Sequence, residues 1–325
     1  MDKHLSLSII IPLYNAEKYI VNCLDSIYDQ DIDSSDFEII IVDDGSNDNS
    51  YHIISDYATK HDNIHIIHQE NQGVACARNN AIKIAKGHYV TFIDSDDFFI
   101  PKSLKKVLRT AIEFKADIIK GVIIEVDEKE MFDDYRFTAK NIVTDVMDGK
   151  EAIVKVTRHK EGYSTGYLIS LKLIKENNLH FPPKVSYMED WAFITPALLN
   201  CKLFVNTNIP FYIYRHNTGS CVANMSTEKL LLSCQAIEIV AELAKKTSGD
   251  VQKKLSVNVC VNINIVLWFT IHYRSIFSRR NEIIRVLLQL LKQVDKSYIP
   301  RSLVIFKLCP ELYIVIRNLL ASRKY

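Results

Sequence analysis

The 325-residue sequence lacks the short motifs that mark the commonest phosphate and metal sites. It contains no internal repeat or low-complexity tract, no HExxH pair of histidines, and no other histidines at metal-ligand spacing. A glycine-rich P-loop and a GxGxxG fingerprint are also missing. The absence of these last two motifs argues against Walker-type ATPases and dinucleotide oxidoreductases.

Cysteine usage and hydropathy indicate a reducing compartment and no bilayer span. The seven cysteines are odd in number, widely scattered and never form a CxxC pair, so we expect reduced, mostly buried thiols. No apolar stretch approaches the roughly 18 to 20 residues needed to cross a bilayer. The N-terminus lacks the pattern of a cleaved signal peptide. We therefore expect the chain to stay in the cytoplasm.

Net positive charge is confined to the end of the chain. Residues 271–325 hold eleven Lys and Arg against three Asp and Glu, a formal charge of +8, whereas residues 1–270 carry −7. The basic segment also holds apolar runs at residues 283–284, 286–288, 303–306 and 312–316. This combination predicts peripheral contact with anionic lipid at the inner face of the membrane. A plain helical packing region with a solvated basic face is the alternative.

Short apolar runs alternate with helical patterns over the first 125 residues. The runs are nearly continuous in apolar residues, as in strands that are covered on both faces of a parallel sheet. They occupy residues 7–13, 37–42, 64–68, 89–93 and 117–125. Between them, apolar residues recur at helical spacing. The repeat predicts an α/β fold with an open, doubly wound, mostly parallel sheet and helices on both faces.

The second half of the chain has a weaker pattern. We expect a polar loop at 130–148, a helix at 169–177, and short strands at 203–205 and 211–214. Beyond residue 227 the pattern is mostly helical, but residues 257–265 alternate with period two, which leaves helix and strand both open there. We predict a catalytic domain at residues 1–225 and a helical C-terminal region at 226–325.

The segment FIDSDD at residues 92–97 joins an apolar strand to three carboxylates. Carboxylates this close raise one another's pKa and repel unless a cation neutralises them. Mg²⁺ and Mn²⁺ take oxygen ligands and commonly share them with a phosphate, so the segment predicts a metal-diphosphate site. Period-two geometry sends Asp94 and Asp96 to the same side. Asp97 could support the metal or cap the next helix, and a solvated acidic turn is the alternative for the whole segment.

Polar residues also follow the second predicted strand and open the third predicted helix. In such sheets ligands lie beyond the carboxyl ends of the strands. There Asp43 and Asp44 offer acceptors for a nucleobase or a ribose, and Gly45 permits a positive φ or a close approach. An ordinary Asp-Gly turn is the alternative. Arg78, one turn into a helix, can reach a phosphate or stack on a base, unless it is a surface arginine.

Two polar pairs stand out later in the chain. Glu189 and Asp190 open an apolar helix, where a carboxylate could accept a proton from an attacking hydroxyl or simply favour the helix dipole. Trp191 could stack on a sugar or belong to the core. Arg215 and His216 follow an aromatic strand, and His216 could ligate a metal, donate to a phosphate or be structural.

Together these segments resemble the family 2 glycosyltransferases of the GT-A fold. Four of them stand in order and in register over about 90 residues: SIIIPLYN at 8–15, VDDGS at 42–46, NQGVACARN at 71–79 and FIDSDD at 92–97. The pairs at 189–190 and 215–216 extend the likeness to about residue 220, beyond which it fades. Residues 163–170 depart from the family pattern, so acceptor contacts there cannot be carried over.

The resemblance implies a role for each matching residue. The donor would be bound by Pro12, Tyr14, Asp44, Arg78, Asp94, Ser95 and Arg215. Within this set, Asp44 would contact the base and Asp94 would lie near the ribose. The metal ligands for Mn²⁺ or Mg²⁺ would be Asp96 and His216, the catalytic base Asp190, and the acceptor contacts Glu189 and Trp191.

The implied activity is metal-dependent, inverting transfer of a sugar from a nucleotide-sugar, most simply a UDP-sugar, to a hydroxyl. The acceptor would be a glycan or a lipid-linked sugar in surface polysaccharide biosynthesis, and no nucleic-acid partner is expected. A nucleotidyltransferase is one alternative, but such an enzyme normally opens with a glycine-rich basic loop, which is absent here. The other alternative is a non-catalytic GT-A-fold subunit that binds nucleotide-sugars or acts as a scaffold. Such a subunit would be expected to have lost a key carboxylate.

Overall fold

The structure is a computed structural model that describes residues 5–127, 142–156, 164–216, 225–273, 279–311 and 313–314. The chain divides into two compact units. The first unit comprises Met1–Val156, Tyr163–Lys184 and Phe193–Ser220, and the second comprises Thr157–Gly162, Val185–Ala192 and Cys221–Tyr325. Each unit therefore draws on separate stretches of sequence. The predicted domain boundary at residue 225 stays a prediction.

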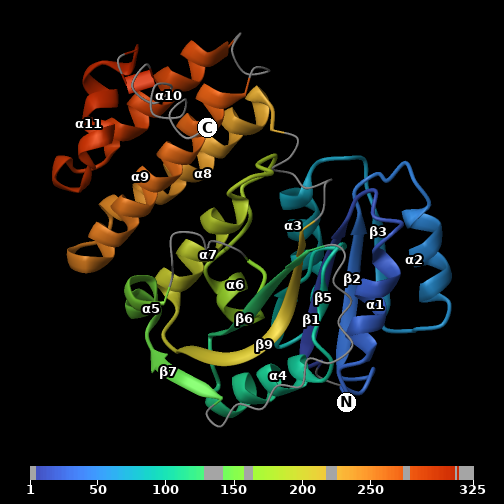
Figure 1. The fold of residues 1–325 in the computed structure, drawn as a ribbon. Coiled ribbons are helices and arrows are strands. Elements are labelled where there is room, and N and C mark those ends of the chain that lie inside the picture. The colour runs from blue at the N-terminus through green and yellow to red at the C-terminus, as the bar shows by residue number, and fades with distance from the viewer. Residues whose placement is uncertain are drawn as a thin grey trace. The chain divides into compact units, whose positions relative to one another are not determined.

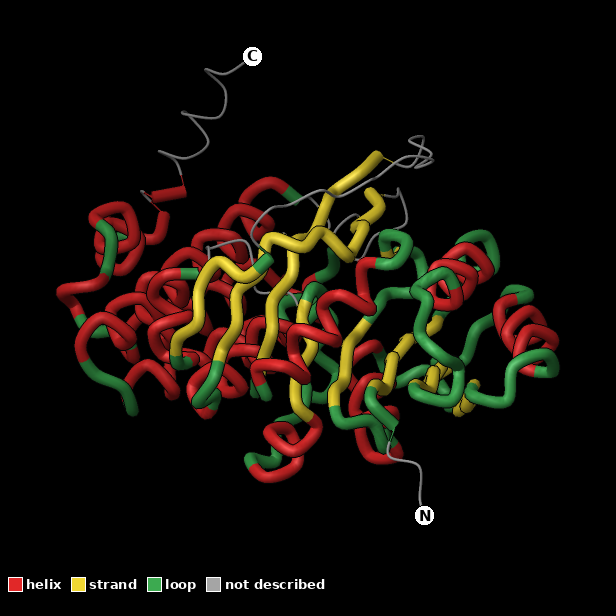
Figure 2. The backbone as a smooth tube through the Cα atoms, turned by 90° about the horizontal axis from the view of Figure 1, so that it is seen from below, coloured by secondary structure: helices red, strands yellow, loops and turns green. Residues whose placement is uncertain are grey.

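The first unit is built around a mixed sheet, nine-stranded over the described residues (Figure 1). The strands are β1 Leu7–Leu13, β2 Phe37–Asp43, β3 Ile64–His68, β4 Tyr89–Phe92, β5 Phe98–Phe99, β6 Ile118–Asp127, β7 Val143–Met147, β8 Tyr167–Ser170 and β9 Phe204–His216. Their order is β3-β2-β1-β4-β8-β6-β9-β5, and β7 pairs with β9 off this path. Figure 2 shows the strands side by side. The predicted open α/β sheet is confirmed.

The N-terminal half of the sheet is parallel. β1 pairs in parallel with β2 on one side and with β4 on the other, and β2 pairs in parallel with β3. Every residue of β1 and β2 is buried, which explains the continuous apolar runs in the sequence. Because neighbouring parallel strands end at the same edge, the loops after β1, β2 and β4 adjoin one another there.

Helices lie on both faces of this parallel half. The helices of the first unit are α1 Ile20–Tyr28, α2 Ser50–Ala58, α3 Val74–Ile84, α4 Ser103–Phe114, α5 Gly149–Lys155, α6 Leu171–Glu176 and the C-terminal part of α7 Glu189–Asn200. Alternate side chains of β1 and β2, such as Ile9 and Ile39, form one core with α1, α2 and α4. The side chains between them point to the other face, where α3 contacts both strands.

Two predicted elements differ from the structure in the second half of the sheet. The predicted strands at 203–205 and 211–214 are one continuous strand, β9. It pairs with β6 through register shifts next to Gly121, where a Cβ atom would lie 2.3 Å from the Phe211 ring. The predicted helix at 169–177 begins late, since Ile169 and Ser170 still pair with neighbouring strands in β8. Tertiary pairing thus overrides the local pattern at both sites.

The polar segment at 130–148 is only partly a loop. Residues 142–148 are described, and within them β7 pairs antiparallel with β9. Three of the five side chains of β7 are exposed, so its sequence lacks the apolar run of a central strand. Residues 130–141 of the expected loop lie outside the described residues.

The second unit is helical over its described residues. Its helices are the N-terminal turn of α7, α8 Thr227–Lys245, α9 Gly249–His272, α10 Arg280–Gln293, a 3₁₀ turn Lys296–Tyr298 and α11 Arg301–Leu308. Residues 257–265, whose pattern left two structures open, are helical. Asn262 and Asn264 donate to carbonyl oxygens four residues earlier, at 3.0 and 3.2 Å, so the helix satisfies its own inward polar side chains. The predicted helical C-terminal region is confirmed.

Helix α9 corrects the expectation that no segment is long and apolar enough to cross a bilayer. Its 24 residues contain a window of mean hydropathy 1.5 with few charges. However, 67% of that window is buried inside the protein. Burial of this extent is typical of a core helix, so the length and composition of α9 are weak grounds for a membrane span.

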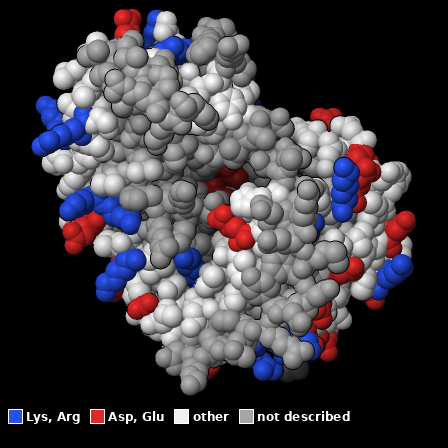
Figure 3. All heavy atoms as spheres, viewed as in Figure 1, with Lys and Arg blue, Asp and Glu red and all other residues white. Residues whose placement is uncertain are grey.

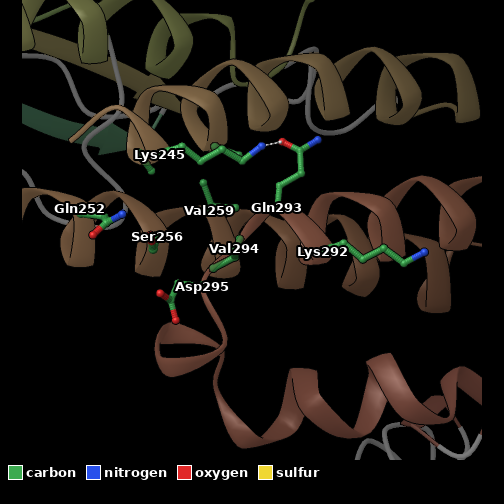
Figure 4. A pocket seen from close by; sticks show the side chains of 10 residues that line it. Lys245, Gln252, Ser256, Val259, Lys292, Gln293, Val294 and Asp295 are labelled. Carbon is green, nitrogen blue, oxygen red and sulfur yellow. Dashed lines mark hydrogen bonds between the residues drawn. The ribbon is translucent and has the colours of Figure 1, made fainter. Parts of the chain in front are cut away.

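A cavity of about 300 Å³ lies between α8, α9 and the segment after α10 (Figure 4). Lys245 at the end of α8 donates to Gln293 Oε1 at 3.2 Å across its rim. Lys245 also pairs with Glu242 at 2.6 Å, so its charge is already balanced. None of the residues predicted to bind a nucleotide-sugar lines this cavity.

Candidate active site

The loops after β1 and β2 are joined by reciprocal hydrogen bonds. The backbone N–H of Asn15 donates to Ser46 Oγ at 3.0 Å, and the N–H of Asn47 donates back to Asn15 Oδ1 at 2.8 Å. Asn15 has a φ of 50°, in the left-handed region that asparagine tolerates. Pro12 is buried in β1, whereas the Tyr14 side chain is 47% exposed. These two hydrogen bonds fix the loop after β1, and Tyr14 lies in that loop directly after the strand.

Asp44 organises the segment that leads into α3. Its carboxylate accepts hydrogen bonds from the Gln69 amide at 2.8 Å and from the backbone N–H groups of Gln72 and Gly73 at 2.7 and 2.8 Å. The residue is 4% exposed. Gly73, at φ 89°, then turns the chain into the helix. Asp44 thus fixes where α3 begins, and its neighbour Asp43 is buried against His68 Nδ1 at 2.6 Å.

Arg78 is a buried residue and not a surface arginine. It is 2% exposed, and its guanidinium lies over the Phe181 ring, 5.2 Å from the centroid. Its Nη2 donates to Asp94 Oδ1 at 2.7 Å. The Asp94 side chain is 31% exposed, so one partner of this ion pair reaches solvent. The structure therefore brings together two of the predicted donor-binding residues.

The Asp94–Asp97 turn is held by a buried tyrosine of β9. Tyr212 Oη donates to Asp97 Oδ2 at 2.5 Å and accepts from the Asp94 N–H at 3.2 Å. Burial raises the pKa of Asp97 well above its ordinary value, and the nearby charges of Asp94 and Asp96 raise it further. Burial likewise raises the pKa of the Cys23 thiol, which lies under the same turn. Ser95 is buried and Asp96 half-buried.

Asp97 does not cap the next helix, as one prediction had it. Helix α4 begins at Ser103, and its N-cap position is Lys102. The side chain of Asp97 instead accepts from the Arg215 backbone N–H at 2.8 Å. The antiparallel pairing of β5 with β9 holds Asp97 beside β9, five residues before the N-cap position of α4.

Arg215 and His216 end β9 with different surroundings. The Arg215 guanidinium lies over two rings, 5.2 Å from the centroid of Tyr19 and 5.1 Å from that of Phe98. His216 Nε2 is 3.0 Å from Glu125 Oε2 on the paired strand β6, and its side chain is 51% exposed. Arg215 thus contacts the Asp94–Asp97 turn, called the acidic turn below, whereas His216 lies beside the carboxylate of Glu125.

Glu189, Asp190 and Trp191 form the first turn of α7 and belong to the second unit. Glu189 and Trp191 are buried, at 7% and 9% exposure, and Asp190 is half-buried. Met188, just before the helix, has a φ of 71°. A positive φ at a residue other than glycine is uncommon and marks a turn directly before the helix.

The residues of the acidic turn suit a metal that is shared with a ligand. Among the described residues, no group of three or more His, Cys, Asp and Glu side chains is arranged to hold a metal ion. Asp94 pairs with Arg78, and Asp97 is bound to Tyr212, so these two carboxylates are already committed within the protein. Mg²⁺ is commonly held by one or two carboxylates plus phosphate oxygens and water. The half-buried Asp96 fits that arrangement, whereas a protein-only cage does not.

Sequence reasoning missed three residues of the site: Tyr19, Phe98 and Tyr212. Tyr19 and Phe98 contact Arg215, and Tyr212 contacts Asp97. These contacts form only because the end of β9 lies beside the turn that follows β4. A buried tyrosine needs a hydrogen-bond partner, so Tyr212 in an apolar strand was a signal that one existed. Its partner, 115 residues earlier, could not be read from the pattern.

Comparison with known proteins identifies the family. The sequence profile of Glycosyl transferase family 2 matches residues 8–171. Glycosyltransferase GlyG of Streptococcus pneumoniae serotype 4 is 31% identical over 259 residues, which are 78% of this chain and 83% of that protein. Poly(ribitol-phosphate) beta-glucosyltransferase of Bacillus spizizenii is 34% identical over 215 residues, 64% of this chain. The match spans only 32% of the length of that relative.

The solved structures agree with the fold. The crystal structure of TarS 1-349 of S. aureus in complex with UDP matches with a TM-score of 0.74 at 20% sequence identity, over 99% of this chain and 93% of that one. The chain belongs to glycosyl transferase family 2 and is a glycosyltransferase with the GT-A fold. The predictions of family, fold and enzyme class are confirmed.

Proposed function

We propose that the chain transfers a sugar from a UDP-sugar to a hydroxyl of a glycan or lipid-linked acceptor, with inversion at the anomeric carbon. The observation that carries the proposal is the role of α3. Asp44 holds the start of this helix, and Arg78 on the helix holds Asp94 after β4. The relatives support a UDP-sugar, since TarS was crystallised with UDP and with UDP-GlcNAc.

The donor would lie over the carboxyl ends of β1, β2 and β4. The half-exposed Tyr14 would stack on the nucleobase, and the buried Pro12 would line the same end of β1. Asp44 already accepts three hydrogen bonds, and a carboxylate has about four acceptor positions, so one remains for a base N–H. Asp94, held by Arg78, would accept from a ribose hydroxyl, and Ser95 would contact the donor beside it.

The chemistry would need a base and a cation at opposite ends of the reacting bond. Asp190 would accept the proton of the acceptor hydroxyl as its oxygen attacks, with Glu189 and Trp191 contacting the acceptor. Arg215, with His216 beside it, would stabilise the negative charge that develops on the departing diphosphate. Mn²⁺ or Mg²⁺ held by Asp96 would neutralise the diphosphate oxygens as a Lewis acid.

The first test is release of nucleoside diphosphate from UDP-, GDP- and dTDP-sugars with Mn²⁺ or Mg²⁺. We expect slow hydrolysis of one UDP-sugar and faster release once a polyol-phosphate or glycan acceptor is added. Thermal shift with each nucleotide accompanies the assay. An absence of both turnover and nucleotide binding would contradict the proposal and favour the non-catalytic scaffold. Binding without release would show that the acceptor is obligatory.

We also propose that the C-terminal part of the second unit contacts anionic lipid at the inner face of the membrane. Helix α11 exposes Val304, Ile305 and Leu308, the last of which is 80% exposed. Lys and Arg side chains project at several places from the surface shown in Figure 3, and Arg301 and Lys307 lie on α11 itself. Apolar residues flanked by cations are typical of peripheral membrane contacts. Residues 315–325 of the basic segment lie outside the described residues.

Cosedimentation with vesicles tests the lipid proposal. We expect binding to vesicles that contain phosphatidylserine and weak binding to pure phosphatidylcholine vesicles, because each cation near an anionic surface contributes about 1 kcal/mol. The double variant Ile305→Asp, Leu308→Asp should release the protein. A matched control is Ile239→Asp on α8, where the side chain is 36% exposed. Equal binding of the double variant and the wild type would overturn the proposal.

A further inference from the structure

Strand β9 places its last residues against the acidic turn. The short strand β5 follows that turn and pairs antiparallel with β9, with Phe98 opposite Ile213 and Phe99 opposite Tyr212. Residues more than 110 positions apart in sequence thereby meet at one point. The turn after β4 and the end of β9 are therefore one structural element.

Hydrogen bonds close a ring between the turn and β9. The Asp94 N–H donates to Tyr212 Oη, Tyr212 donates to Asp97 Oδ2, and the Asp97 N–H donates to the Asp94 carbonyl oxygen at 3.0 Å. Asp97 Oδ1 additionally accepts from the Arg215 N–H. Asp97 and Tyr212 are 1% and 0% exposed. A buried ring in which each polar atom is paired resists distortion, because any movement leaves one of them unpaired.

The guanidinium of Arg215 is held in place, in addition to its backbone N–H, which is bound by Asp97. Its guanidinium lies over the rings of Tyr19, at the start of α1, and Phe98, in β5. A cation over an aromatic face is attracted by the ring quadrupole. An arginine side chain free in solvent loses considerable rotamer entropy when it binds a ligand. The two rings remove much of that loss in advance.

We propose that Asp97, Tyr212, Tyr19 and Phe98 are positioning residues that fix Arg215 relative to the Asp94–Asp96 turn. In this arrangement the guanidinium stays aimed at the diphosphate that leaves the sugar. The inference rests on the proposed function, because it needs the donor diphosphate at this turn. Its physical basis is preorganisation: a charge that is already in place stabilises the transition state without reorganisation. A misplacement of about 1 Å can cost on the order of a hundredfold in rate.

The test compares two buried tyrosines that each lose one hydroxyl. Tyr212→Phe removes the link to Asp97, while Tyr89→Phe removes hydrogen bonds to the carbonyl oxygens of Ala111 and Ala116 at 2.8 and 3.0 Å. Tyr89 is the first residue of β4, and its hydroxyl does not contact the turn. Each variant removes two hydrogen bonds of one buried hydroxyl, so both should lower the unfolding midpoint by similar amounts. We expect Tyr212→Phe to lower kcat about thirtyfold with little change in the donor KM. Tyr89→Phe should keep wild-type kcat.

A double-mutant cycle with Arg215→Ala separates positioning from general damage. If Tyr212 acts through Arg215, Tyr212→Phe should change kcat by less than about twofold in the Arg215→Ala background. The same thirtyfold loss in both backgrounds, or a Tyr212→Phe variant with wild-type kcat, would overturn the inference. Tyr19→Leu leaves the hydrogen bonds among Asp94, Asp97 and Tyr212 intact. Its loss of kcat should likewise disappear in the Arg215→Ala background, so this variant replaces Tyr212→Phe if the latter does not fold.

The cycle also separates this inference from the proposed function. A slow Arg215→Ala variant with additive effects would remove the positioning role and leave the transferase proposal standing. Wild-type turnover in Arg215→Ala would remove both the positioning role and the proposed role of Arg215 at the diphosphate. The absence of both UDP-sugar turnover and nucleotide binding in the wild-type protein would contradict the proposed function itself.

Discussion

Asp190→Asn is expected to lower the rate of sugar transfer by about a thousandfold while the affinity for UDP changes less than about threefold. The amide matches the carboxylate in size but cannot accept the proton of the acceptor hydroxyl, and general-base catalysis typically contributes 10²- to 10⁴-fold. The residue lies in the first turn of α7, where a lost negative charge costs about 0.3–1 kcal/mol through the helix dipole. The variant should therefore fold and still bind donor.

The matched control is Asp250→Asn, which removes an acidic residue from the first turn of α9 in the same unit. Asp250 is exposed and should give wild-type turnover. Single-turnover transfer and calorimetric UDP binding are measured on both variants. Transfer by Asp190→Asn above a tenth of the wild-type rate would exclude Asp190 as the base, and Glu189→Gln would then be the next variant to measure.

Strand and helix positions in the first half followed from the sequence because the sheet there is parallel. Because β1 is buried on both faces, its sequence is a nearly continuous apolar run, and its predicted and observed bounds agree. The bounds of the edge strand β3, which is only partly buried, agree as well. The polar residues that interrupt this pattern fall where the strands end, so the candidate site was visible as well. Asp94 and Arg78, predicted separately as donor-binding residues, are in contact at 2.7 Å.

The later strands could not be predicted because their structure depends on distant partners. Asn206, Asn208 and Pro210 interrupt the apolar pattern in the middle of β9, yet the strand continues because β6 and β7 pair with it on either side. The role of Tyr212 is hidden for the same reason. Nothing local distinguishes it from a core aromatic residue until the pairing of β5 with β9 brings Asp97 within 2.5 Å.

Asp44 shows how a correct motif can conceal a second role. The sequence indicated a donor contact, but in the structure the carboxylate first secures three donors of the segment that leads into α3. A carboxylate that accepts several N–H groups is both rigid and electrostatically satisfied. Loss of Asp44 would thus displace Arg78 as well as any contact with the base, so a variant at this position cannot isolate base recognition.

Asp96→Ala is expected to abolish the metal dependence of donor binding and to lower transfer by at least about a hundredfold. Lewis-acid stabilisation of a leaving group is worth several kcal/mol, which corresponds to a loss of this size. In wild-type protein, Mn²⁺ should tighten UDP binding, and chelation should reverse that gain. In the variant, UDP should bind with the same affinity in the presence and absence of Mn²⁺. The exposed Asp62→Asn variant is the control and should retain the metal effect.

The same substitution should remove the stabilisation that metal and nucleotide together give to the protein. The charge of Asp96 contributes to the raised pKa of Asp97, and a bound cation would offset that charge. Added Mn²⁺ with UDP should then stabilise only the wild type, since a ligand raises stability in proportion to the occupancy of its site. A variant that loses stability in chelator would show that Asp96 is a structural residue of the turn, and undiminished wild-type transfer in chelator would show that Arg215 alone supplies the charge.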